Sequence, residues 1–267
     1  MSQVYRPPTK SDRECKHWWF DGWDWFVNQA LKGFGLPKIV GTADEVALDL
    51  HIHTLFSHCS ISQPERIIRH AAKLGLDGIA IMDHDDTRGA EDAVRCADYL
   101  RHKQAIPDDF IVIPGIEISS NQGHIGSLFL TELVSDALSP EETVRRIQEA
   151  GGLAVAVHPY HSTGIGDAIF DAPFDAVEVE CASVFPVDQA DKNLQLVDEP
   201  RLEQAAKIGT SDAHYVNAVG SCYTLVKTED RTVNGIRGAL AAGSSKAVTT
   251  DACRRLRSRL GGVRKLK

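Results

Sequence analysis

The sequence lacks several features that would place it in a familiar class. Its six cysteines are scattered, with no C-x-x-C motif, so free thiols in a reducing compartment are expected rather than disulfides. The longest apolar runs, such as Leu153–Val157, are far too short to span a bilayer. The first ten residues contain no apolar core of a signal peptide, which makes the cytoplasm the expected location.

Nucleotide-binding motifs and a uniformly basic surface are also missing. No G-x-G-x-x-G or Walker loop follows any expected strand, which removes the usual support for a nucleotide-binding open sheet. The net charge is −8. Residues 253–267 carry seven Lys and Arg and no acid, while the rest of the chain carries 22 basic and 37 acidic residues. This acidic body argues against broad coating of nucleic acid.

Composition divides the chain into three parts. Residues 1–44 form a Trp-rich extension, residues 45–250 the main domain, and residues 251–267 a basic tail that is predicted to be mobile. Trp19, Trp23, Phe26 and Ala30 fit one helical face. We interpret this segment as a helix docked on the main domain, with a self-association surface or a membrane-surface role as alternatives.

From residue 45 onward, strand-like and helix-like runs alternate. Strands are predicted at 46–50, 78–82, 110–118, 125–130, 153–157, 176–179, 207–209, 223–226 and 247–249. Helices are predicted after capping boxes at 62–65 and 139–142, and over 88–102, 189–206 and 232–242. This α/β alternation favours parallel strands with helices outside, and over about 200 residues it favours a barrel over an open sheet.

Acidic and imidazole side chains gather where these strands end. Period two places Asp49, His51 and His53 on one face of the first strand. Other strand ends carry Asp83-His84-Asp85, Glu117, His124, His158 and Asp212-Ala213-His214. Imidazoles with carboxylates suit Zn, Mn or Fe. Because these ligands exceed the need of one ion, we expect two or three divalent metal ions, with Glu117 or Asp212 bridging.

As a set, these motifs resemble a known family. The stretches DLHIHT, MDHD, PGIEIS with a following GH, AVHP and GTSDAH resemble the PHP (polymerase and histidinol phosphatase) phosphoesterases, from about residue 45 to 250. The stretch GSCYTLVKTED is similar to the C-terminal part of standalone members. The resemblance implies a distorted seven-stranded (β/α) TIM-like barrel with a trinuclear metal site at the carboxyl ends of the strands.

The resemblance also implies a ligand set. By matching position, the ligands are His51, His53, His84, Glu117, His124, His158, Asp212 and His214. At a ninth position the family often has an aspartate in an SDG-like turn, and some members have histidine one residue later. This chain reads Ser57-His58-Cys59 there, and His58 is the candidate.

Three further residues are candidates for a catalytic role. Asp83 precedes a ligand and is expected to orient it, with a purely structural cap as the alternative. Arg88 follows the DHDD turn and could hold a phosphate. His161 shares a loop with His158 and could donate to a phosphate or protonate a leaving group. Glu180 and Cys181 also end a strand, and their role is open.

These observations predict a metal-dependent phosphoesterase that acts on small-molecule or nucleotide phosphates through metal-activated water. The alternatives are a 5′–3′ exonuclease or oligoribonuclease on short single-stranded nucleic acid, a histidinol-phosphate phosphatase, or a metal-binding module without activity. Amidohydrolase barrels also begin with H-x-H but usually carry a bridging lysine on strand four, and residues 124–131 contain no lysine.

Overall fold

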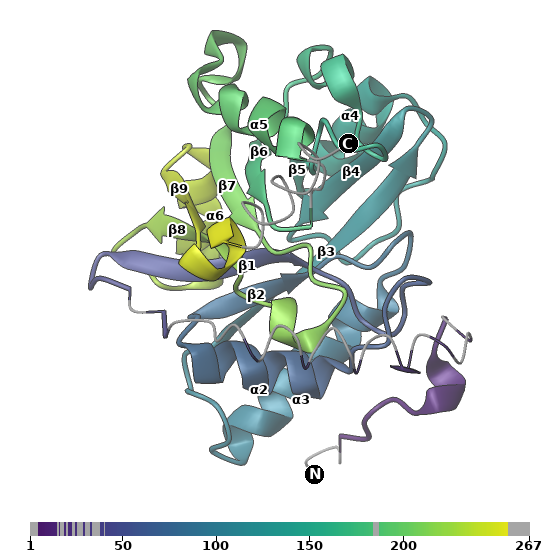
Figure 1. Cartoon of the computed structure of the whole chain (residues 1–267), viewed down its shortest axis with the longest axis vertical. Coiled ribbons are helices and arrows are strands. Elements are labelled where there is room, and N and C mark those ends of the chain that lie inside the picture. Colours follow the sequence, from purple (N-terminus) through teal and green to yellow (C-terminus); the bar gives the residue numbers. More distant parts are fainter. Residues whose placement is uncertain are drawn as a thin grey trace.

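The computed structural model describes residues 5–14, 16, 19, 21, 22, 25, 29, 33, 38, 39, 41–183 and 187–255. The helix predicted in the Trp-rich extension falls largely outside these residues, and so does the tail from residue 256. Of the four tryptophans, Trp19 and Trp25 are described, and both are exposed. The first strand, β1, begins at Glu45, and Figure 1 shows the arrangement of the chain from there on.

One mixed sheet organises the described part of the main domain. Its strands are β1 (Glu45–Ile52), β2 (Gly78–Ile81), β3 (Ile111–Ser120), β4 (Gly123–Leu128), β5 (Leu153–Ala156), β6 (Ala176–Cys181), β7 (Ala206–Thr210), β8 (Cys222–Lys227) and β9 (Ser245–Thr249). They pair in the order β7-β6-β5-β4-β3-β2-β1-β8-β9. Gly209 on β7 donates to Thr224 Oγ1 on β8, and this hydroxyl donates back to Gly209 O, so the sheet nearly closes into a barrel.

The strand directions correct the expectation of an all-parallel sheet. β1–β2, β2–β3, β5–β6 and β6–β7 pair in parallel, whereas β3–β4, β4–β5, β1–β8 and β8–β9 are antiparallel. β4 reverses because only residues 121 and 122 separate the paired Ser120 and Gly123, and so short a link makes a hairpin. Consequently β4 begins at the end of the barrel where β3 finishes, which places His124 beside the carboxyl ends of the parallel strands.

The helices agree with the sequence expectations in most places. They are α2 (Pro64–Leu74), α3 (Arg88–His102), α4 (Pro140–Glu149), α5 (Val187–Gln195) and α6 (Val233–Ala241). The Ser139 hydroxyl accepts from Glu142 N and caps α4 as predicted. The prediction of a capping box that begins at Ser62 is wrong, because Gln63 is the N-cap of α2 and makes no side-chain cap hydrogen bond. α5 is shorter than predicted and continues as the 3₁₀ turns η3 (Leu196–Asp198) and η4 (Pro200–Leu202).

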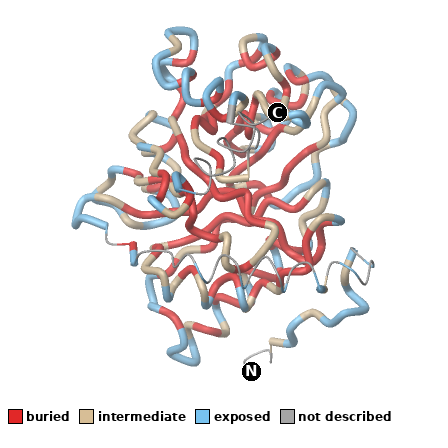
Figure 2. The backbone as a smooth tube through the Cα atoms, viewed as in Figure 1, coloured by how far each residue is buried: buried red, intermediate tan, exposed pale blue. Residues whose placement is uncertain are grey.

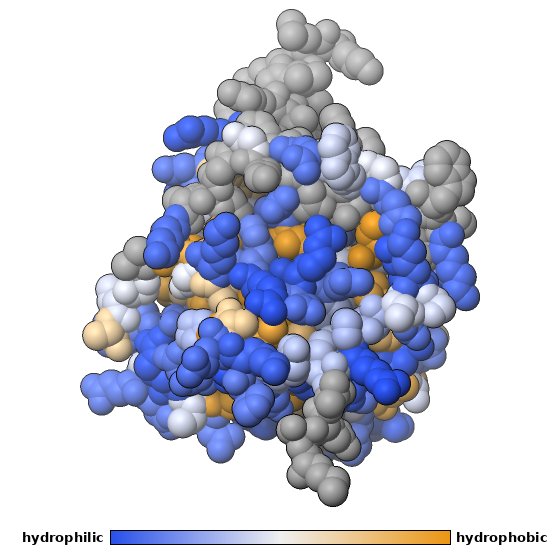
Figure 3. Space-filling view, turned by 90° about the horizontal axis from the view of Figure 1, so that it is seen from below, coloured by the Kyte–Doolittle hydropathy of each residue, from blue (hydrophilic) through white to orange (hydrophobic). Residues whose placement is uncertain are grey.

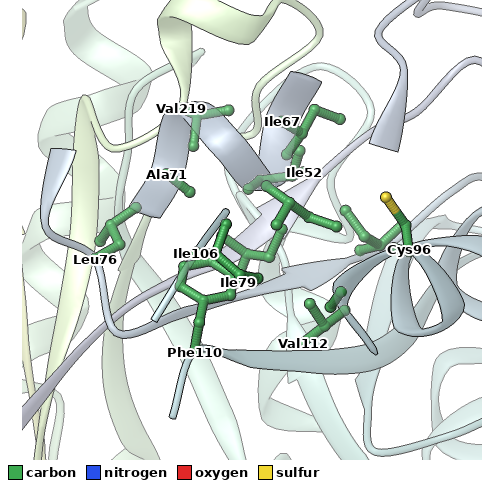
Figure 4. Packing of buried hydrophobic residues seen from close by; sticks show 14 of the residues in the cluster. Ile52, Ile67, Ala71, Leu76, Ile79, Cys96, Ile106, Phe110, Val112 and Val219 are labelled. Atoms are coloured by element: carbon green, nitrogen blue, oxygen red, sulfur yellow. The ribbon is translucent and has the colours of Figure 1, made fainter. Parts of the chain in front are cut away.

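Apolar packing surrounds the sheet on both faces. Figure 2 shows the buried residues concentrated along the strands. Between the sheet and α2 and α3, Ile52, Ile67, Ile79, Cys96 and Phe110 belong to one cluster (Figure 4). A separate cluster fills the interior with side chains of alternate strand residues, among them Val46, Leu48 and Leu50. This packing fixes the strand ends that carry the polar side chains.

The outer surface on the side of α2 and α3 is mainly hydrophilic, with separated apolar side chains (Figure 3). Three exposed arginines of these helices, Arg69, Arg88 and Arg95, pair with neighbouring acids, and Arg69 lies 2.9 Å from Glu65. In the part of the chain that the structure describes, no helix is long and apolar enough to cross a bilayer.

Candidate metal centre

Glu117, on β3, lies at the centre of a buried cluster of imidazoles. Its Oε2 atom is 3.3 Å from His51 Nε2, 3.2 Å from His53 Nε2 and 3.2 Å from His84 Nδ1, and its Oε1 atom is 2.9 Å from His124 Nδ1 and 3.0 Å from His158 Nε2. One carboxylate therefore contacts five imidazoles, which come from β1, β4 and the loops after β1, β2 and β5.

Asp212, which follows β7, is the second carboxylate near the imidazoles of His51 and His53. Its Oδ1 atom is 3.1 Å from His53 Nε2, 3.6 Å from His51 Nε2 and 3.8 Å from His214 Nδ1. Its Oδ2 atom accepts a short hydrogen bond from the Ser183 hydroxyl. The Nε2 atoms of His51 and His53 thus each lie near both carboxylates, so Glu117 and Asp212 belong to one cluster.

The buried charges perturb one another strongly. Burial alone would lower the pKa of His53, but Asp212 and Glu117 raise it to about 9. Burial likewise opposes the ionised form of Glu117, yet His51 and the other imidazoles hold the pKa of this carboxyl well below its usual value. Burial also opposes ionisation of Asp212, but His51, His214 and His53 hold the pKa of its carboxyl well below the usual value. Both carboxylates are therefore anionic at neutral pH, and protonated imidazoles balance their charge.

Two imidazoles of the cluster are neutral. Burial lowers the pKa of His84 to about 3 and that of His214 to about 4. The buried Nδ1 atom of His158 has no hydrogen-bond partner among the described residues. Neutral imidazoles such as those of His84 and His214, beside anionic carboxylates, are suitable donors for divalent transition ions.

Three groups of side chains bring one ligand atom each to within 4.8 Å of one another. They are His51, His53 and Glu117; His84, Glu117 and His124; and His53, Cys59, His84 and His214. The groups overlap at His53, His84 and Glu117. The donor set therefore fits divalent metal ions at adjacent positions, and among the shared residues the Glu117 carboxylate, with two oxygens, would suit a bridging role.

The backbone is held in unusual conformations at this end of the barrel. His158 and Asp212 have positive φ angles of 28° and 47°, and Asp85, next to His84, has a φ of 50°. Non-glycine residues in this region cost of order 1–3 kcal/mol each. Specific contacts offset this cost at Asp85, whose carboxylate accepts from the Ser119 N–H and hydroxyl.

Glu178, on β6, is a site residue that the sequence reasoning missed. Its Oε1 atom lies 2.9 Å from His51 Nδ1 and accepts from the Thr210 hydroxyl, and its Oε2 atom accepts from the His158 backbone N–H. It therefore orients one imidazole and one strand end at once. The sequence did carry one signal for it: Glu178 is an acidic residue inside the mainly apolar strand 176–181.

The three candidate catalytic residues lie in different surroundings. Asp83 is buried and accepts from the Thr54 N–H and from the hydroxyls of Thr54 and Ser57, so it ties the loop after β1 to the end of β2. Arg88 is exposed and pairs with Asp86. These contacts agree with a positioning role for Asp83, and the catalytic roles stay predictions.

The third catalytic candidate, His161, and the predicted ninth ligand, His58, lie at the rim of the cluster. The ring centroid of His161 lies 5.3 Å from that of His158, and its Nδ1 atom is 2.8 Å from Thr163 Oγ1. The exposed ring of His58 stacks on His84 with a centroid separation of 4.8 Å. The structure thus places His58 outside the three groups, whereas its neighbour Cys59 belongs to one of them.

Comparison with known proteins gives the same assignment as the motifs. A PHP domain model matches residues 49–166, and a PHP-associated model matches residues 204–245. An uncharacterised protein of Methanocaldococcus jannaschii is 38% identical over 143 residues, which cover 49% of this chain and 79% of that protein. The chain belongs to the PHP domain family. A second uncharacterised protein of this organism is 27% identical over 188 residues, covering 66% of this chain and 68% of the relative.

Solved structures share the PHP fold of this chain. A two-domain protein from Bacteroides vulgatus that contains a predicted PHP-like metal-dependent phosphoesterase aligns with a TM-score of 0.62 and 20% identity, covering 80% of this chain and 68% of that one. PsfC from Pseudomonas syringae aligns with a TM-score of 0.58 and 18% identity, covering 84% and 98%. At such identity these likenesses support the fold alone, and they confirm the predicted distorted TIM-like barrel.

Proposed function

We propose that this PHP protein hydrolyses phosphate esters of small molecules or nucleotides. The observation that supports the proposal is the contact of the buried Glu117 carboxylate with five imidazoles, because this donor set exceeds the need of one ion. When bound, divalent ions supply Lewis-acid activation of water and neutralise charge on a phosphoryl group.

The side chains divide into holding and positioning roles. The proposed ligands are His51, His53, His84, Glu117, His124, His158, Asp212 and His214. Glu178 fixes the Nδ1 side of His51, so the Nε2 atom of this imidazole points toward the two carboxylates. The proposed number of ions is two or three, drawn from Zn, Mn and Fe.

His161 is the proposed donor to the substrate. The Thr163 backbone N–H donates to its Nδ1 atom at 3.4 Å, which places the ring proton of a neutral imidazole on Nε2. Burial lowers the pKa of His161, so this neutral form prevails at neutral pH. The Nε2–H group is then the donor toward a phosphate oxygen or the departing alcohol.

A substrate screen with Zn²⁺ or Mn²⁺ tests the proposal. The panel contains histidinol phosphate, mononucleotides, 3′,5′-bisphosphates and short 5′-phosphorylated RNA. We expect turnover of at least one monophosphate, and loss of turnover in His51→Ala and Asp212→Ala. A metal-loaded protein that hydrolyses none of these compounds would instead support a metal-binding module without activity.

Isotope position tests the chemistry independently of the substrate. In heavy-oxygen water, a single turnover should place the label in the released phosphate, or in the 5′-phosphate of a cleaved nucleotide. Label in the alcohol product would mean attack at carbon. A trapped phosphoenzyme would mean a protein nucleophile, and either result would overturn direct attack of water on phosphorus.

A further inference from the structure

The loop that follows β1 brings a cysteine to the metal centre. The Cys59 Sγ atom and one ring nitrogen from each of His53, His84 and His214 lie within 4.8 Å of one another. Cys59 is free and half-buried, whereas the other described cysteines are buried. This group contains no carboxylate, which separates it chemically from the two groups that include Glu117.

Hydrogen bonds hold this loop on both sides of Cys59. The Ser57 hydroxyl donates to Asp83 Oδ1 at 2.6 Å and accepts from the His84 backbone N–H at 3.1 Å. The Ser60 hydroxyl donates to His214 O at 3.0 Å. The backbone that carries Cys59 is thus fixed relative to the two segments that carry the imidazoles facing its thiol.

We propose that Cys59 is a metal ligand, and that its thiolate completes a four-donor set with His53, His84 and His214. One thiolate with three imidazoles suits tetrahedral Zn²⁺. Sulfur favours Zn²⁺ over Mn²⁺, which prefers carboxylate and water ligands. Binding replaces the S–H bond by a metal–sulfur bond, and the proton passes to solvent. The proposal rests on the proposed function, because the same cluster holds the metals there.

Substitution of Co²⁺ provides a readout that does not depend on activity. A thiolate bound to Co²⁺ gives a charge-transfer absorption band in the near ultraviolet, which imidazole and carboxylate ligands do not give. We expect this band in the parent protein and in the control Cys96→Ala, whose cysteine lies on the buried face of α3. Cys59→Ser should lose the band. A band that persists in Cys59→Ser, or that is absent from a parent protein with bound Co²⁺, would overturn the proposal.

Thiol reactivity tests the proposal without altering Cys59. In a Cys15→Ser background, Cys59 is the one cysteine of the described part that is not buried. Zn²⁺ should slow its reaction with Ellman's reagent by roughly an order of magnitude or more, because a coordinated thiolate is shielded. Equal reaction rates in metal-free and Zn²⁺-loaded protein would contradict coordination.

Metal preference gives a third measurement. Cys59→Asp replaces a soft ligand with a hard one at the same place, so the Zn²⁺ to Mn²⁺ affinity ratio should fall by roughly tenfold or more. An unchanged ratio would count against the proposal.

Failure of the cysteine-ligand proposal can be told apart from failure of the proposed function. A parent protein that binds Co²⁺ and hydrolyses phosphate esters but lacks the charge-transfer band refutes only the cysteine ligand. A parent with the band but without hydrolysis refutes only the function.

Discussion

At the residue scale, the site depends on two carboxylates that are shared among many imidazoles. Glu117 contacts five imidazoles and Asp212 faces three, with His51 and His53 common to both. A shared carboxylate makes the occupancy of neighbouring metal positions interdependent. Removing a residue at the centre should therefore affect more than one position, while removing a residue at the edge should affect one.

Metal content tests this difference. Glu117→Gln should lower the number of bound ions per chain by more than one, because two of the three ligand groups include Glu117. His124→Ala removes a member of one group, so it should cost at most one ion. Elemental analysis of metal-loaded protein measures both, with Glu141→Gln at an exposed position as a charge-matched control. Equal losses in the Glu117 and His124 variants would contradict a bridging role for Glu117.

Glu178 should act through the ligands that it orients. Glu178→Gln removes the negative charge beside His51 Nδ1 and weakens the hold on the His158 backbone. Residues that orient ligands typically contribute 10–100-fold to metal affinity, so we expect a loss of about this size. Titration with a metal-sensitive dye checks it against Glu141→Gln, which should bind as the parent does. Parental affinity in Glu178→Gln would contradict an orienting role for the Glu178 carboxylate.

At the scale of elements, the ends of the helices and strands carry the residues that shape the site. α3 begins directly above the Asp83 contacts, and a Cβ atom on Gly89 would lie 1.7 Å from Asp83 Oδ2 and 2.5 Å from Thr54 Oγ1. Glycine at this place therefore lets the start of the helix approach the hydrogen bonds that tie β2 to the loop after β1.

Gly89→Ala should force this start of α3 away from Asp83, at a cost of about 1–3 kcal/mol in the free energy of unfolding. Gly238 provides the matched control, because it is an exposed position on α6 where an added Cβ atom would have nothing within 4 Å. Gly238→Ala should stabilise the protein by up to about 1 kcal/mol through higher helix propensity. Urea unfolding measures both, and a Gly89→Ala variant as stable as the parent would contradict the close packing.

The sequence predicts much of the fold because its strands are short apolar runs and its helices carry clear ends. The bounds of α3 are as predicted, and Ser139 caps α4. The direction of β4 was missed, since periodicity gives the type of an element but not its partner. The motif series nonetheless marked His124 at the start of this strand, and the structure places its ring beside Glu117.

The part of the site that was not predicted depends on three-dimensional contacts. Glu178 lies far in sequence from His51, and an acid inside a strand carries no signal of its partner. His58 was predicted as the ninth ligand, but the direction of each side chain in this turn depends on the folded backbone. In the structure the His58 ring is exposed and stacks on His84, and its role as a ligand stays a prediction.

At the scale of the whole molecule, the metal centre joins segments that lie far apart in the chain. His51 on β1, Glu117 on β3 and Asp212 after β7 meet in one place, and β7 also approaches β8 where the sheet nearly closes. Without a metal, the same cluster holds several imidazoles and two ionised carboxylates away from water. The charges are then compensated by imidazolium groups rather than by divalent ions.

Metal binding should therefore stabilise the whole barrel. An ion that binds only the folded chain contributes about 2.7 kcal/mol when its free concentration is about 100 times its Kd. We expect a higher urea midpoint with excess Zn²⁺ or Mn²⁺ than with chelator, and recovery of the higher midpoint when metal is restored. The Glu117→Gln variant should show a smaller difference, because fewer ions bind. Since the cluster joins β1, β3 and the segment after β7, fluorescence and circular dichroism should report the same shift. A parent protein with bound metal whose unfolding curve is unchanged by chelation would show that the cluster is held by the surrounding packing alone.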